Sequence, residues 1–106
     1  MARIKKLVVI AVSTGGPKAL HKLIPMFDEN LDAPIVIVQH MPKGFTSSLA
    51  ERLNESSMIT VSEVVDGEVL QKGHVYLAKG GRHLEIAEDQ QGQLFFERTI
   101  MSRLIV

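Results

Sequence analysis

Two short, unbroken apolar runs constrain this chain more than any other feature of its sequence. Residues 7–12 and residues 34–39 are both rich in β-branched side chains, which is typical of strands buried on both faces of a sheet. Between the runs, Pro17 is suited to the first turn of a helix, and residues 19–27 carry apolar side chains at helical spacing. A strand, a helix and a second strand in this order predict a parallel pair joined by a right-handed crossover.

A second helix and a third strand are predicted next. Residues 45–54 repeat apolar side chains at helical spacing, with Thr46 or Ser47 as the candidate N-cap. Residues 59–64 alternate apolar and polar side chains, as in a strand with one face less deeply covered. We therefore expect a βαβαβ unit over about residues 6–65, the start of a parallel α/β sheet.

The pattern changes from Asp66 onward, where glycine-containing pairs separate short apolar segments. This punctuation predicts β-hairpins over about residues 66–98. No internal repeat or linker divides the chain, so we treat residues 1–106 as one domain at most. Residues 104–106 are apolar and carry no stop signal, and only two helices are expected for at least three core strands. We expect a fold that is incomplete.

Composition excludes several classes of protein. The chain has 12 Lys and Arg against 12 Asp and Glu, so no overall positive field favours a nucleic-acid partner. The absence of cysteine excludes disulfides, thiolate nucleophiles and cysteine zinc sites, and fits a cytoplasmic protein. The apolar run near the start has only six residues, far fewer than the roughly 20 that a membrane span needs. We therefore expect no membrane insertion.

Ser13 is the first candidate for chemistry, because it follows the first predicted strand and precedes a helix. The carboxyl edge of a parallel sheet is where ligands bind. Gly15 and Gly16 permit close backbone approach, and the free N–H groups of the first helical turn favour an oxyanion or a phosphate. The alternative is that Ser13 only caps the helix.

His40 ends the second strand as Ser13 ends the first. Neighbouring parallel strands lie roughly 5 Å apart, so the imidazole could take the hydroxyl proton of Ser13 during an acyl transfer. The alternative is a polar side chain that only reaches water. His83 either lines the same edge or bonds the backbone of a loop, and His74 is expected to be structural. The four histidines lack paired metal-ligand spacing, so no metal site is predicted.

Several ordered motifs give this chain a family resemblance over about residues 7–86. They are AVSTGGP at 11–17, VQHMPKGFT at 38–46, Asp66-Gly67, GHVYLA at 73–78 and GRHLE at 81–85. In this order they closely resemble the catalytic domain of the chemotaxis protein-glutamate methylesterases, the CheB family. The resemblance implies a three-layer, doubly wound, mostly parallel and Rossmann-like sheet.

The resemblance also implies an activity and a set of roles. Family members hydrolyse glutamyl methyl esters on methyl-accepting chemotaxis receptors, and many deamidate receptor glutamines, with a Ser-His-Asp triad and no cofactor. Ser13 matches the nucleophile and His40 the general base. Thr14 lies in the matching segment with Gly15 and Gly16, which makes these three the expected substrate and oxyanion site. The candidate lining residues of this site are Met41 and His83.

Two departures from the family pattern qualify this expectation. Nothing in the chain matches the G-M-G-x-D-G segment that carries the family's aspartate, and Asp66 is better explained as a turn residue. In the chemotaxis enzymes a receiver domain precedes the catalytic domain, and residues 1–106 contain no match to one. A receiver domain or a second chain is therefore an expected partner, and the alternative function is a non-catalytic half-domain that binds an anion or a receptor. An exposed sheet edge would also favour self-association.

Overall fold

The computed structural model describes residues 4–12, 16–42, 44–80 and 84–98. Its elements follow the predicted order of strand, helix, strand, helix and strand, and then continue with three further strands. Their bounds are β1 Val8–Val12, α1 Gly16–Leu23, the 3₁₀ turn η1 Ile24–Met26, β2 Ile35–Gln39, α2 Phe45–Glu55, β3 Thr60–Glu63, β4 His74–Leu77, β5 Leu84–Glu88 and β6 Leu94–Arg98. No helix in the described part of the chain is long and apolar enough to cross a membrane.

The main sheet is parallel and has the strand order β1-β2-β4-β3. Its first pair is the predicted one, since β1 and β2 run side by side from the pair Val8 and Ile35 to the pair Val12 and Gln39. These two strands therefore end level with each other at the carboxyl edge of the sheet. The expectation of a mostly parallel α/β sheet is confirmed. The expectation that both apolar runs are buried on both faces is wrong for β1, because this strand pairs with β2 alone among the described strands and Val8 and Val9 are exposed.

The expectation of hairpins throughout residues 66–98 is wrong for β4. This strand lies between β2 and β3 and pairs in parallel with both. Val75, Tyr76 and Leu77 are all buried, because both faces of a central strand are covered. The connection that precedes β4 contains no helix, and its glycine turns gave the segment the appearance of a hairpin. The later part of the expectation is confirmed, since β5 and β6 form an antiparallel hairpin.

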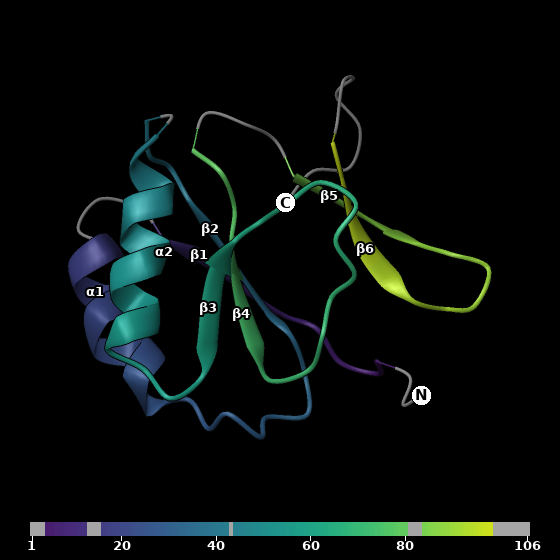
Figure 1. The fold of residues 1–106 in the computed structure, drawn as a ribbon, viewed down its shortest axis with the longest axis horizontal. Coiled ribbons are helices and arrows are strands. Elements are labelled where there is room, and N and C mark those ends of the chain that lie inside the picture. Colours follow the sequence, from purple (N-terminus) through teal and green to yellow (C-terminus); the bar gives the residue numbers. More distant parts are fainter. Residues whose placement is uncertain (1–3, 13–15, 43, 81–83, 99–106) are drawn as a thin grey trace.

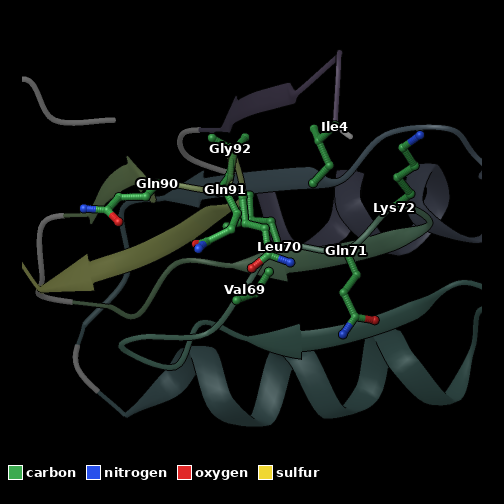
Figure 2. A pocket seen from close by; sticks show the side chains of 10 residues that line it. Ile4, Val69, Leu70, Gln71, Lys72, Gln90, Gln91 and Gly92 are labelled. Carbon is green, nitrogen blue, oxygen red and sulfur yellow. The ribbon is translucent and has the colours of Figure 1, made fainter. Parts of the chain in front are cut away.

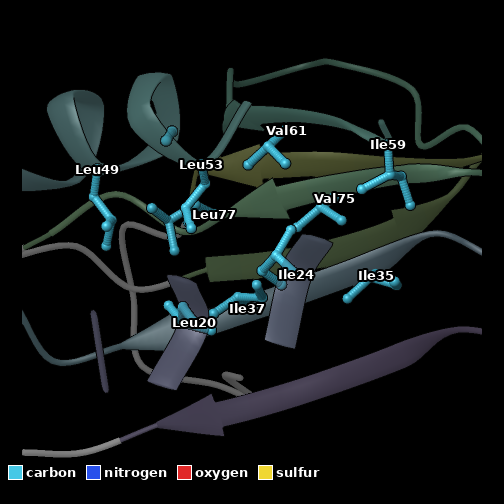
Figure 3. Packing of buried hydrophobic residues seen from close by; sticks show 11 residues of the cluster. Leu20, Ile24, Ile35, Ile37, Leu49, Leu53, Ile59, Val61, Val75 and Leu77 are labelled. Carbon is cyan, nitrogen blue, oxygen red and sulfur yellow. The ribbon is translucent and has the colours of Figure 1, made fainter. Parts of the chain in front are cut away.

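The two helices and the hairpin cover opposite faces of the main sheet, which makes three layers (Figure 1). Leu20 and Ile24 on one helical segment, and Leu49 and Leu53 on the other, pack on the helix face (Figure 3). Tyr76 and its neighbours on the other face pack against the hairpin. The buried members of this hairpin-face cluster are Val36, Val64, Leu70, Tyr76, Ala78, Leu84 and Phe96. Alternation along β2 and β4 thus supplies residues to both cores.

The expectation that Thr46 or Ser47 is the N-cap of helix α2 is wrong. Gly44 is the N-cap, with φ of 94°, and makes no side-chain cap hydrogen bond. A positive φ of this size suits glycine, which has no Cβ. Thr46 therefore lies inside the first helical turn, where its hydroxyl is directed to other partners. Helix α1 begins at Gly16 with Pro17 in its first turn, as predicted.

Candidate functional site

The candidate site lies where β1 and β2 end. Val12 and Gln39 are the last residues of these strands and are register partners, and His40 follows Gln39 with an exposed side chain. An exposed imidazole at a strand end is accessible to a substrate from solvent. Ser13, Thr14 and Gly15 follow Val12 but lie outside the described residues, as does His83. Their predicted roles stay predictions.

Gly16 packs tightly against the ends of both strands. An ideal Cβ on Gly16 would lie 2.7 Å from Nε2 of Gln39 and 3.0 Å from Cβ of Val12. Only a residue without a side chain lets helix α1 begin this close to the sheet. Gly16, the described member of the expected oxyanion site, is therefore buried at the start of a helix, where the first N–H groups have no partner within the helix.

Gln39 is a site neighbour that the sequence analysis did not single out. Its side chain is only 7% exposed, and its Oε1 atom has no hydrogen-bond partner within the described ranges. Buried polar atoms are usually paired, so this residue differs from an ordinary core position. The signal in the sequence was an amide at the end of an otherwise apolar run, just before His40.

The backbone after His40 is packed against a glycine from another part of the chain. Met41 is partly buried and contacts the helix-face core. An ideal Cβ on Gly80 would lie 2.4 Å from the carbonyl oxygen of Pro42 and 2.7 Å from that of Met41. The segment that carries the imidazole therefore rests directly on the backbone that follows β4. The expected lining role of Met41 is not tested by this packing.

Thr46 joins three elements close to the same edge. Its side chain is completely buried, and its hydroxyl donates a hydrogen bond to Oε2 of Glu63, the last residue of β3. The same oxygen accepts a hydrogen bond of 3.0 Å from the N–H of Gly80. The sequence analysis missed this link, because the three residues are far apart in the chain and β4 was not recognised as a central strand.

A serine and a histidine are in contact on the hairpin face of the sheet, away from the candidate site. Oγ of Ser62 lies 2.8 Å from Nε2 of His74, and the imidazole stacks on Tyr76 with ring centroids 4.2 Å apart. Burial lowers the pKa of His74, while the negative charge of Glu68 acts in the opposite direction. Burial also raises the pKa of Tyr76 to about 12. This packed arrangement fits the structural role expected for His74.

A cavity of about 970 Å³ lies elsewhere, between the loop before β4 and the turn of the hairpin (Figure 2). It is lined by Ile4, Val69, Leu70, Gln71, Lys72, Gln90, Gln91, Gly92, Gln93 and Leu94. None of these is a predicted site residue. Within the described ranges, no group of three or more His, Cys, Asp or Glu side chains could hold a metal ion.

These features define an α/β protein with a candidate site at the carboxyl ends of two neighbouring parallel strands. A family model described as CheB methylesterase matches residues 8–103, and the chain belongs to the CheB methylesterase family. The family resemblance seen in the sequence motifs is confirmed.

Curated relatives with the name protein-glutamate methylesterase/protein-glutamine glutaminase support the same assignment. The Bacillus subtilis protein is 50% identical over 88 residues, which cover 83% of this chain and 25% of the relative. The Thermotoga maritima protein is 53% identical over 91 residues, which cover 86% of this chain and 26% of the relative. The chain thus spans about a quarter of the length of these relatives.

A solved structure agrees with the fold. The crystal structure of the Thermotoga maritima CheB methylesterase catalytic domain superposes with a TM-score of 0.86 at 46% identity. The match covers 98% of this chain and 53% of that domain. The α/β fold class is therefore shown both by the strand order and by a close structural relative.

Proposed function

We propose that this chain carries the serine and histidine of a protein-glutamate methylesterase of bacterial chemotaxis, as part of a catalytic domain over residues 1–106. The observation that carries the proposal is the level ending of β1 and β2, where Val12 and Gln39 are register partners. Ser13 and His40 are the next residues after this pair. Neighbouring strands are about 5 Å apart, which supports the proposal that the two side chains come within reach of a proton transfer.

The proposed reaction is an acyl transfer through a covalent intermediate. His40 takes the hydroxyl proton as Oγ of Ser13 attacks the carbonyl carbon of a glutamyl methyl ester, and the imidazolium returns the proton to the departing methoxide. Methanol leaves, and water then hydrolyses the acyl-serine to a free glutamate carboxyl and regenerated serine. Backbone N–H groups of Thr14, Gly15 and Gly16 are proposed to stabilise the oxyanion. No step in this sequence of events needs a cofactor or a metal.

The substrates and partners follow from the same proposal. The relatives are named as methylesterases and glutaminases, so we propose methylated glutamates of cytoplasmic chemoreceptor regions as substrates, with glutamines as a second class. Nucleic acid is not a proposed partner, because the net charge is zero. Met41 and His83 are proposed to line the site.

The third member of the triad is proposed to come from sequence outside residues 1–106 or from a second chain, because no segment here matches the family's aspartate motif. In triad enzymes the acid holds the imidazole tautomer, and its loss costs about 10⁴ in turnover. The 106-residue chain should therefore be a slow esterase on its own.

Methanol release from methylated receptor tests the proposal. The chain should release methanol faster than the spontaneous rate, and Ser13→Ala and His40→Ala should both return release to that rate. Equal release by the chain and by Ser13→Ala would overturn the assignment. A chain that releases none, yet binds phosphate or a receptor-derived peptide in calorimetry, would support the alternative function of a non-catalytic half-domain.

A further inference from the structure

The segment that carries His40 is held by a polar link that no catalytic role explains. The chain leaves β2 at Gln39, passes through His40, Met41 and Pro42, and enters helix α2 at Phe45. A backbone hydrogen bond of 3.3 Å from the N–H of Phe45 to the carbonyl of Pro42 closes this turn. The contacts that hold this turn against the sheet therefore determine the position of the His40 imidazole.

Gly80 is the backbone against which this turn rests. The carbonyl oxygens of Pro42 and Met41 would lie 2.4 Å and 2.7 Å from a Cβ at this position. Such distances leave no room for a side chain, so the two backbones are in direct contact. Gly80 follows β4 by three residues and is buried. Any movement of Gly80 is therefore transmitted to Met41, the residue next to His40.

Thr46 in turn holds Gly80. Its buried oxygen accepts the N–H of Gly80 at 3.0 Å, while its hydroxyl hydrogen is donated to the carboxylate of Glu63. A backbone N–H can only donate, so the hydroxyl oxygen of Thr46 is the acceptor towards Gly80, and its hydrogen remains available for Oε2 of Glu63. Hydrogen bonds in such a chain polarise and strengthen one another. The hydrogen bond to the half-buried Glu63 thus strengthens the hydrogen bond between Thr46 and Gly80.

We propose that Thr46 and Glu63 are positioning residues of the candidate site, which set the place of the His40 imidazole through Gly80 and the Met41-Pro42 backbone. This inference rests on the proposed function for its catalytic consequence, because His40 is taken there as the general base. Its geometric content is independent of that function. A shift of about 1 Å in a catalytic group can cost up to a hundredfold in rate, so a small relaxation of this link should be measurable.

The first test uses the rate at which a fluorophosphonate probe labels Ser13 in the 106-residue chain. Thr46→Val keeps the shape of the side chain but removes both hydrogen bonds, and should slow labelling about tenfold or more. Thr46→Ser restores the hydroxyl and should return the rate to within about twofold of the parent. The matched control is Thr60→Val, the same change at an exposed position on β3, which should leave the rate unchanged.

A second readout does not need any activity. The ring signal of His40 in a ¹H–¹³C NMR spectrum should shift in Thr46→Val, keep its parent position in Thr60→Val, and return towards it in Thr46→Ser. If Thr46→Val does not fold, Glu63→Leu, which removes the acceptor of the Thr46 hydroxyl, is measured in its place and should shift the same signal. A parent chain that is not labelled at Ser13 would count against the proposed function alone. An unchanged His40 signal in the folded variant would overturn the positioning inference, as would a parental labelling rate.

Discussion

At the scale of single residues, two glycines decide how closely the backbone can approach the candidate site. Gly16 admits the start of α1 against Gln39, and Gly80 admits the turn after His40. Both are close-approach positions at the carboxyl edge, and neither has a positive φ. The sequence analysis identified the first because it lies in a glycine pair before a helix. The close approach of Gly80 could not be predicted, because its partner Pro42 is far away in the sequence.

Gly80→Ala is therefore expected to destabilise the fold. The new Cβ would lie 2.4 Å from the carbonyl oxygen of Pro42, and overpacking of this kind typically costs about 1–3 kcal/mol. Urea denaturation measures the loss. Gly44→Ala is the informative control, since its φ of 94° strains any side chain but no atom lies within 4 Å of the new Cβ. An alanine at residue 80 that leaves the urea midpoint unchanged would contradict the close approach.

Stability should also depend on pH through His74. Burial lowers the pKa of this imidazole in the folded chain, so the unfolded chain binds the proton more readily. The free energy of unfolding should be highest above the unfolded pKa of about 6.5. The free energy of unfolding should fall as the pH drops below that value. The fall should end below the pKa that His74 has in the folded chain, where both states bind the proton. The free energy of unfolding can be measured from denaturation curves at pH 8, 6.5 and 5. His74→Gln should remove this part of its pH dependence. An unchanged pH dependence in His74→Gln would assign the effect to other groups.

At the scale of elements, the hairpin β5–β6 is the layer that covers the sheet face opposite the helices. Phe96 is completely buried there, with its ring edge against Tyr76 at a centroid distance of 5.0 Å. Removal of a buried Phe side chain costs about 3–5 kcal/mol, so Phe96→Ala should lower the free energy of unfolding by that amount. Phe45→Ala, at a position 60% exposed, should change it by less than about 0.5 kcal/mol. Equal losses in the two variants would show that the hairpin adds little to the core.

The elements also show where sequence reasoning succeeds and where it stops. The βαβ unit was predictable, because both strands are continuous apolar runs and the intervening helix has a clear period. The level ends of β1 and β2 then followed from topology. The place of β4 was not predictable, since a four-residue strand bounded by glycine turns has the pattern of a hairpin strand. The link from Thr46 to Glu63 and Gly80 depends on that strand, so it could not be foreseen either.

At the scale of the whole molecule, β1 forms one edge of the described sheet, because it pairs with β2 alone among the described strands. Leu7, Val8 and Val9 are 37%, 38% and 44% exposed. An exposed apolar edge offers unpaired backbone groups to another strand. We expect the chain to self-associate at high concentration in sedimentation experiments. Val9→Lys should weaken this association, whereas Val65→Lys, at an exposed position outside the strands, should not. A single monomeric species at all concentrations would contradict the expectation.

In the proposed mechanism, the activity of the whole molecule depends on Ser13 as a nucleophile that His40 activates. The most direct measurement is to treat the chain with a fluorophosphonate and locate the adduct by peptide mass mapping. We predict one adduct on the peptide that contains Ser13, its loss in Ser13→Ala, and labelling that is slower by about 10²–10⁴ in His40→Ala, the typical contribution of a general base. An adduct on another serine, or an equal rate in His40→Ala, would contradict the account.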